Sequence, residues 1–172
     1  DILDFSKIES GNLELNVEEI KLSDLAKEVI DTVKYEALQK KLEVDLQIDP
    51  EVPIRIWIDP IRIKQVLINL LGNAVKFTAT GKIKLTIATL DKIDIHQTIV
   101  RFSVIDTGIG IKSENQAKIF EAFSQEDSTT TRQFGGTGLG LSISNKILAL
   151  MNSKLQLTSH PNQGSTFYFD LI

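Results

Sequence analysis

The chain has 172 residues, of which 42% are hydrophobic, and a formal net charge of −4. This length can bury a core of its own, and we expect one main domain. The acidic balance argues against nucleic-acid binding, and the absence of cysteine excludes disulfides and zinc–thiolate sites. No apolar run approaches the roughly 20 residues of a membrane span. We expect a soluble, cytoplasmic domain from a longer protein, because the chain begins at Asp1 rather than Met; an inner-membrane anchor elsewhere in that protein stays open.

The first part of the chain alternates between helical and strand patterns. Residues 1–10 show a short amphipathic pattern that stops at Gly11, as a helix arriving from a preceding segment would. Apolar residues at helical spacing predict a long helix from a capping Ser23 to about residue 41. Alternation of apolar and polar residues predicts three strands, over residues 13–20, 44–48 and 54–58.

The second long helix has the clearest start signal. Asp59 can cap its first turn, Pro60 suits the first helical position, and an apolar stripe continues to Ala74. Alternation then predicts two further strands, over residues 83–87 and 99–105.

The last third of the chain combines a short helix, a polar loop, a third long helix and a hairpin. We predict the short helix over residues 117–123 and a mobile lid over residues 124–136, which are rich in Ser, Thr and Gly. A helix over residues 139–151 follows, and a hairpin around Asn162-Gln163-Gly164 closes the chain. Together the elements predict an α/β fold in two layers, with a mixed, mostly antiparallel sheet packed on three long helices.

Three polar residues, Asn69, Asn73 and Lys76, share one side of the second long helix because their spacing is i, i+4, i+7. Asn and the intervening Gly72 are poor helix formers, and such local violations suggest a functional site. An Asn amide oxygen can ligate Mg²⁺, and Lys76 would place a positive charge near phosphates. A solvated polar face would explain the same spacing, so the helix alone leaves both interpretations open.

An apolar strand ends at Asp106, and Gly108 and Gly110 permit a sharp turn directly after it. A buried carboxylate there could accept a hydrogen bond from the exocyclic amine of adenine, whereas guanine presents an acceptor at the same position. Two alternatives exist. One is an ordinary Asx turn, and the other is the Asp-Thr-Gly of aspartic proteases, which needs a second carboxylate that only a symmetric dimer could supply here.

Four glycines stand within the six residues 135–140, directly before the third long helix. Glycine lets backbone N–H groups approach an anion, and a helix start adds unpaired donors. The spacing matches neither the dinucleotide-binding fingerprint nor the P-loop. A flexible hinge is the alternative. Arg132 and the hydroxyl cluster over residues 128–131 add donors that could fold over phosphates.

Taken together and in this order, residues 69–77, 106–110, 119–123 and 136–140 resemble the N, first-glycine, F and second-glycine boxes of sensor histidine kinases. The resemblance covers nearly the whole chain. It implies the Bergerat fold, an α/β sandwich that gyrase-type ATPases, heat-shock chaperones and mismatch-repair ATPases share. Residues 1–11 are similar to the end of the dimerisation and histidine-phosphotransfer hairpin of hybrid kinases, and residues 12–172 would then be the catalytic domain.

The resemblance implies ATP and Mg²⁺ as cofactors. Asn73 would ligate Mg²⁺, and Asp106 would read the adenine base. Gln125 stands where many relatives carry a basic residue, so Arg132 is the candidate for the γ-phosphate. Catalytic roles are implied for Asn69, Lys76 and Arg132. The implied ATP-binding set is Asn69, Asn73, Lys76, Phe77, Asp106, Gly108, Gly110, Ile111, Phe123, Gly136, Thr137, Gly138, Leu139, Gly140, Leu141 and, through a water, Thr166.

We therefore expect a protein-histidine kinase domain that transfers the γ-phosphoryl group of ATP to a histidine on a helical hairpin absent from this chain. Neither His96 nor His160 lies in the helical context of such an acceptor. A gyrase-type ATPase is one alternative, disfavoured because Asn69 replaces the glutamate that activates water; a catalytically silent nucleotide-binding pseudokinase is the other. The implied partners are the chain's own or a second subunit's hairpin and a response-regulator receiver domain in a phosphorelay. We expect a homodimeric full-length protein and a monomeric fragment.

Overall fold

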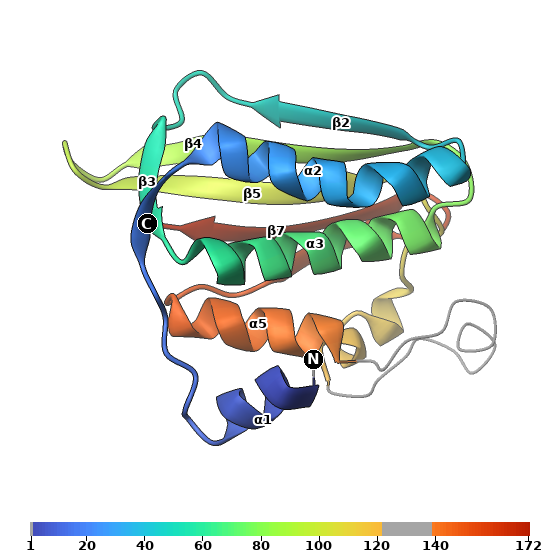
Figure 1. Cartoon of the computed structure of the whole chain (residues 1–172). Helices are drawn as coiled ribbons and strands as arrows, with labels where there is room; N and C mark the ends of the chain where they lie inside the picture. Colours follow the sequence, from blue (N-terminus) through green and yellow to red (C-terminus); the bar gives the residue numbers. More distant parts are fainter. Residues whose placement is uncertain (1, 122–138) are drawn as a thin grey trace.

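The main feature of the computed structural model is a five-stranded sheet with helices on one face (Figure 1). The structure describes residues 2–121 and 139–172. Strand order in the sheet is β2-β4-β5-β7-β6; β2 and β4 are parallel and the other neighbours antiparallel. The predicted mixed, mostly antiparallel sheet is confirmed. Its strands are β2 (Glu43–Ile48), β4 (Lys82–Lys92), β5 (Thr98–Asp106), β7 (Gly164–Leu171) and β6 (Gln156–His160).

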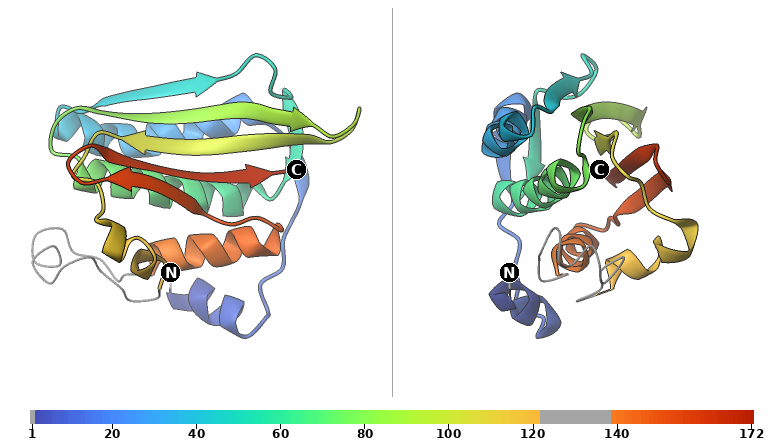
Figure 2. Two further views of the ribbon diagram at one scale, coloured as in Figure 1. Left: turned by 180° about the vertical axis from the view of Figure 1, so that it is seen from behind. Right: turned by 90° about the vertical axis from the view of Figure 1, so that its right-hand side faces the viewer.

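Three helices lie on the same side of this sheet: α2 (Leu22–Gln39), α3 (Pro60–Phe77) and α5 (Gly140–Leu150) (Figure 2). α3 packs on β4 and β5, while α2 and α5 lie beside α3. Between the layers, Leu67 and Leu71 of α3 and Phe102 of β5 are fully buried. Phe102 stacks on Phe169 of β7 with ring centroids 5.1 Å apart. Each such side chain contributes about 1.5–3 kcal/mol by leaving water, so α3 is held firmly on the sheet.

Both ends of α3 are stabilised by polar side chains, its own N-cap residue at the start and a lysine from the end of α2 at the other end. At its start, the Asp59 carboxylate accepts hydrogen bonds from the backbone N–H of Arg62 at 3.1 Å and of Asn16 at 2.8 Å. At its end, Lys40 donates from Nζ to the carbonyl of Val75 at 2.5 Å, where a cation complements the helix dipole. The predicted cap at Asp59 and the proline at the first helical position are confirmed.

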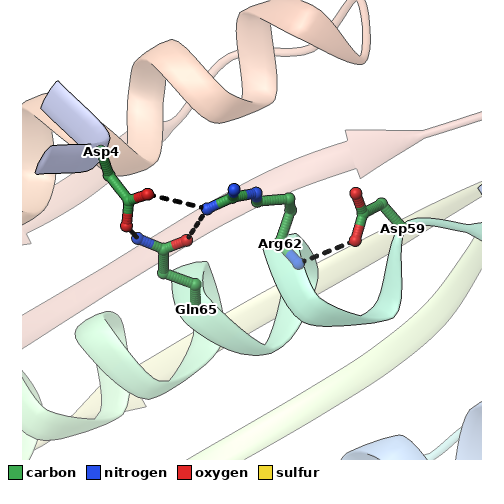
Figure 3. Close-up of polar contacts among 4 residues, drawn as sticks. All are labelled: Asp4, Asp59, Arg62 and Gln65. Carbon is green, nitrogen blue, oxygen red and sulfur yellow. Dashed lines mark hydrogen bonds and ion pairs between the residues drawn. The ribbon is translucent and has the colours of Figure 1, made fainter. Parts of the chain in front are cut away.

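The short helix α1 (Ile2–Glu9) makes polar contacts with α3 and α5, and its half-buried Phe5 and Ile8 pack against the hydrophobic core. Asp4 accepts hydrogen bonds from Arg62 Nη1 at 3.2 Å and from Gln65 Nε2 at 2.8 Å, both on α3 (Figure 3). On the α5 side, Lys146 forms an ion pair with Glu9 and lies 4.7 Å from the ring centroid of Phe5. α1 is thus attached to both helices that border the predicted site.

Several expected elements differ from the observed ones. The strand predicted over residues 13–20 is only β1 (Glu18–Lys21), which pairs with β3 (Arg55–Ile58) in a separate two-stranded sheet. α2 begins at Leu22, whose N–H donates to the Ile54 carbonyl, so this pairing rather than a Ser23 cap sets its start. In the described part of the short helix predicted over residues 117–123, residues 117–121, the structure has the 3₁₀ turn η2 (Lys118–Phe120); a second 3₁₀ turn, η1 (Ser113–Asn115), precedes it. The predicted lid over residues 124–136 lies outside the described residues. Within the described ranges, no helix combines the length and apolarity needed to cross a bilayer.

Candidate nucleotide-binding site

The polar side of α3 carries four of the predicted site residues. Asn69, Asn73, Lys76 and Phe77 are all half-buried along this helix, next to its buried apolar stripe. The Lys76 ammonium lies 5.7 Å from the ring centroid of Phe77, within the range of a cation–π contact. The structure therefore places this group between the core and the surface, where side chains can meet a ligand.

The start of α5 contacts Asn69, the first of these four residues along α3. Asn69 donates from Nδ2 to the Ser144 hydroxyl at 3.2 Å. A Cβ on Gly140, the first residue of α5, would lie 2.2 Å from Asn69 Oδ1, so a side chain at that position would displace the Asn69 amide. Leu139 at the N-cap position has no side-chain group that could cap the helix. The backbone N–H groups that begin α5 thus lie beside Asn69, and such groups favour anions.

The turn after β5 contacts the other end of α3. Asp106 is 8% exposed, and its Oδ1 accepts a hydrogen bond from the Gly108 N–H at 2.8 Å. This bond forms an Asx turn, one of the alternatives that the sequence left open. It occupies one lone pair of the Asp106 carboxylate, and the remaining lone pairs can still accept a hydrogen bond from a ligand. Burial raises the pKa of Asp106, and hydrogen bonds from the N–H groups of Gly108 and Ser165 only partly oppose that effect.

Two glycines allow this turn to pack closely. A Cβ on Gly108 would lie 2.4 Å from the Phe77 carbonyl oxygen. Gly110 has φ +69°, and a Cβ there would lie 2.0 Å from the His160 carbonyl oxygen. The Ile109 N–H donates to the Phe77 carbonyl at 3.3 Å, which ties the turn to the end of α3. Ile111 is half-buried, and its N–H donates to the Ser159 hydroxyl at 2.8 Å.

Strand register puts Thr166 on the face of the sheet opposite to Asp106. In the β5–β7 pair, Asp106 is opposite Ser165, and Thr166 is opposite Ile105. Side chains alternate between the two faces along a strand, so Ser165 shares the helix-covered face with Asp106 and Thr166 does not. The register thus brings Ser165, rather than Thr166, to the face that carries Asp106, and the water-mediated approach of Thr166 to the base stays a prediction.

The remaining predicted residues divide into two groups. Leu139 is 1% exposed and belongs to the core, and Leu141 is half-buried in the first turn of α5. The rest lie outside the described residues and stay predictions: Phe123, Arg132, Gly136, Thr137 and Gly138.

Sequence reasoning missed three hydroxyl residues at this site. Ser144 bonds Asn69, Ser159 bonds the turn after β5, and Thr78 lies buried at the end of α3. The four-residue spacing from Gly140 to Ser144 could have indicated the first, because both then share one side of α5. The other two depend on long-range packing.

The side chains at this site suit Mg²⁺ that is bound together with a nucleotide better than a metal ion that the protein alone would hold. Among the described residues, no group of three or more His, Asp or Glu side chains could hold a metal ion. Asn73 offers a neutral amide oxygen, and Mg²⁺ commonly completes its octahedron with phosphate oxygens and water. A phosphate chain near Asn73 and the start of α5 would supply those ligands.

Comparison with known proteins agrees with this geometry. Residues 58–172 match the family described as histidine kinase-, DNA gyrase B-, and HSP90-like ATPase. The signal transduction histidine-protein kinase BarA of Escherichia coli (strain K12) is 40% identical over 99% of this chain and 18% of BarA. The sensor protein GacS of Pseudomonas syringae pv. syringae is 40% identical over 99% of this chain and 19% of GacS. The chain thus spans less than a fifth of the length of these relatives.

Two solved structures resemble the whole domain. Full-length ShkA in complex with AMPPNP matches with a TM-score of 0.87 and 33% identity, over 99% of this chain and 34% of ShkA. The nucleotide-free catalytic domain of histidine kinase ThkA matches with a TM-score of 0.74 and 34% identity, over 91% of this chain and 97% of that domain. The chain belongs to the histidine kinase-, DNA gyrase B-, and HSP90-like ATPase family and is homologous to the catalytic ATP-binding domains of sensor histidine kinases.

Proposed function

We propose that this chain binds Mg-ATP and transfers its γ-phosphoryl group to a histidine on a helical hairpin outside the chain, as part of a two-component sensor histidine kinase. One observation carries the proposal: the polar side of α3 contacts two other segments. At Phe77 it contacts the turn of residues 106–110, called the Asp106 turn below, and at Asn69 it contacts the start of α5. Ile109 contacts Phe77 at the first junction, and Gly140 adjoins Asn69 at the second. The family match and the AMPPNP complex of ShkA support the choice of ATP.

The spacing of these two junctions fits an extended nucleotide. Phe77 and Asn69 are eight residues apart on one helix, which corresponds to roughly 12 Å along its axis. Adenine would bind beside Asp106, whose buried carboxylate accepts from the exocyclic amine. The phosphates would then lie along α3, near Asn69 and Asn73 and the first N–H groups of α5, with Lys76 adding positive charge.

We assign Asn73 as the Mg²⁺ ligand within this arrangement. Its half-buried amide lies one turn from Asn69, on the side of α3 that the phosphates would occupy. Bound Mg²⁺ would neutralise negative charge on the phosphates. Among the chain's own residues, Asn69 and the start of α5 orient the phosphates. Arg132, which lies outside the described residues, stays the predicted γ-phosphate contact.

Transfer to histidine suits this site better than hydrolysis. Asn69 has no carboxylate and cannot act as a base toward water, whereas an imidazole acceptor is itself the nucleophile. We therefore expect slow hydrolysis of ATP without an acceptor. A pseudokinase that binds ATP and transfers nothing stays the alternative to test.

We further propose that residues 1–11 end the dimerisation and histidine-phosphotransfer hairpin and that residues 12–172 form the catalytic domain. α1 contacts this domain at α3 and α5, where Asp4 and Glu9 make polar contacts, and its Phe5 and Ile8 pack against the hydrophobic core. The hairpin, in the same or a second subunit, would be the phosphate acceptor and the site of dimerisation. A receiver domain would take the phosphoryl group next, in the cytoplasm.

The experiment mixes this chain with labelled Mg-ATP and a separately produced histidine-bearing hairpin from a hybrid kinase. Acid-labile, base-stable phosphate on the hairpin is the expected result, and a hairpin with its histidine replaced by alanine should stay unlabelled. Rapid release of free phosphate would instead identify an ATPase. ATP binding without labelled hairpin or free phosphate would identify a pseudokinase and contradict the proposal.

A further inference from the structure

The last turn of α3 leads directly into extended chain. Thr78, the residue after the helix, has φ −110° and ψ 114° rather than the left-handed conformation of a glycine cap. The last carbonyl groups of a helix have no N–H partner within it, and they carry the negative end of its dipole. In α3 they belong to the turn that carries Lys76 and Phe77, two residues of the proposed nucleotide site.

Lys40 supplies a cation to these carbonyl groups from the neighbouring helix. This half-buried residue follows the end of α2, and its Nζ donates to the Val75 carbonyl at 2.5 Å and to the Lys76 carbonyl at 3.2 Å. α2 and α3 run side by side in the same direction, so they end at the same side of the molecule (Figure 1). The ammonium group therefore satisfies two carbonyl groups and offsets the helix dipole.

The next carbonyl group along α3 is held by a different segment. Phe77 accepts through its carbonyl from the Ile109 N–H at 3.3 Å, in the Asp106 turn. Three consecutive carbonyl groups, those of residues 75–77, thus have partners outside α3. The backbone that carries the Lys76 side chain is fixed between the end of α2 and the turn beside which adenine would bind.

Lys76 is the basic residue of this last turn, and a lysine there can fold back on the last carbonyl groups of its own helix. Its ammonium instead lies 5.7 Å from the ring centroid of Phe77, on the side of α3 that carries Asn69 and Asn73. Because Lys40 already places a positive charge at the carbonyl oxygens, a second ammonium there would meet like-charge repulsion. The contact of Lys40 therefore bears on where the Lys76 ammonium lies.

From these contacts we infer that Lys40 is a positioning residue of the nucleotide site: its ammonium caps α3 in place of Lys76 and keeps the Lys76 ammonium directed toward the phosphates. The inference rests on the proposed function, in which Lys76 adds positive charge near the phosphates. It gives a role in binding to the end of α2, a helix that contributes none of the predicted site residues. Lys40 acts through Lys76 and does not itself touch the nucleotide.

A double-mutant cycle on Mg-ATP binding, measured by calorimetry on the full chain, tests this inference. Lys40→Met keeps an aliphatic side chain and removes the cation, which lets Lys76 fold back on the carbonyl groups. It should weaken ATP binding about 3- to 10-fold, close to the effect of Lys76→Met. The double variant Lys40→Met/Lys76→Met should bind ATP no more weakly than Lys76→Met alone. Lys40→Arg, which restores a cation, should bind ATP as tightly as wild type does.

Lys64→Met is the matched control, because Lys64 also links the same two helices. It forms an ion pair with Glu28 of α2 at 2.5 Å, near the start of α3. Lys64 lies twelve residues before Lys76, which corresponds to about three helical turns. Its replacement removes a cation between α2 and α3 without touching the last turn, so ATP binding should not change.

Three results would overturn the inference. The first is equal ATP affinity of Lys40→Met and Lys64→Met, and the second is a Lys76→Met variant that binds ATP as wild type does. The third is the same fold-loss from Lys40→Met with and without Lys76→Met, which a general loosening of the helix would give. Should Lys40→Met fail to fold, the neutral Lys40→Gln goes through the same cycle with the same criteria. Absence of ATP binding in wild type would overturn the proposed function itself.

Discussion

Replacement of Asp106 by asparagine tests base recognition with almost no change in side-chain shape. The carboxylate is 8% exposed and accepts from Gly108 N–H at 2.8 Å, a bond that an amide oxygen can keep. The amide nitrogen would then take the place of the second carboxylate oxygen and present a donor to the adenine amine. Two donors facing each other in a buried site cost about 1–3 kcal/mol, so ATP should bind roughly 5- to 150-fold more weakly.

Stability should respond differently from binding. Burial raises the pKa of Asp106, which means that the folded state disfavours the ionised form. Asparagine removes this unfavourable term and weakens the hydrogen bonds from Gly108 and Ser165, and the two effects oppose each other. We expect the melting temperature to stay within about 4 °C of wild type, the shift that corresponds to about 1 kcal/mol in a domain of this size.

The raised pKa of Asp106 also determines in which direction folding stability and ATP affinity change with pH. Between the ordinary value of 3.8 and the higher folded value, the native state binds a proton that the unfolded state has lost. The stability that this proton contributes is lost as pH rises through the folded pKa. ATP needs the carboxylate, so its affinity should increase as pH rises through the same value, and Asp106→Asn should lack this step.

Calorimetric titration with ATP, combined with thermal unfolding of the free protein, measures both quantities. GTP is the useful second ligand, because the asparagine amide can donate to the guanine carbonyl oxygen and should reduce the preference for ATP. Unchanged ATP affinity in a folded Asp106→Asn variant would refute the assignment of Asp106 as the adenine acceptor.

Three further substitutions test other parts of the structure. Gly140→Ala would place a Cβ 2.2 Å from Asn69 Oδ1 and force that side chain away from Ser144. The lost hydrogen bond, about 0.5–1.5 kcal/mol, is offset by the better helix propensity of Ala, so we expect weaker ATP binding by calorimetry with little change in melting temperature. Gly110→Ala, at φ +69° and against a backbone oxygen 2.0 Å away, should lower the free energy of unfolding in urea by about 1–3 kcal/mol or more. Asp4→Asn should slightly destabilise the docked α1 at neutral pH, by up to about 1 kcal/mol in the free energy of unfolding.

Each of these substitutions has its own control. Gly72→Ala adds a methyl group to α3 with nothing within 4 Å and should stabilise the protein; a similar result for Gly110→Ala would contradict the close approach of that turn. Normal ATP affinity in Gly140→Ala would argue against a role for Asn69 at the phosphates. For Asp4, burial would raise the pKa, but hydrogen bonds from Gln65 and Arg62 outweigh it and hold the pKa below 3.8. The stability contributed by Asp4 is present above that value and lost as pH falls, so the difference from Asp4→Asn should vanish in acid; a constant difference would contradict the ion pair.

Local sequence patterns determined the parts of this protein that depend on near neighbours. Asp59 and Pro60 specify the start of α3 because a capping carboxylate and a proline act within one helical turn. Gly164 and Asn162 specify the final hairpin, since both adopt positive φ in its turn. The order of the Asn-rich helix, the Asp106 turn and the glycine-rich segment was enough to indicate the family, which the comparisons confirm.

Tertiary structure alone decided which of these residues meet and which way they face. The Asn69–Gly140 and Phe77–Gly108 approaches join segments tens of residues apart, and no local pattern encodes such distances. Thr166 faces away from Asp106 because the β5–β7 register is set by the whole sheet, and a shift of one residue would reverse it. Thr78 ends a helix like many other residues; only the packing of the Asp106 turn over it buries its hydroxyl beside a carboxylate. Burial and register arise from contacts between distant segments, so they appear only once the chain has folded.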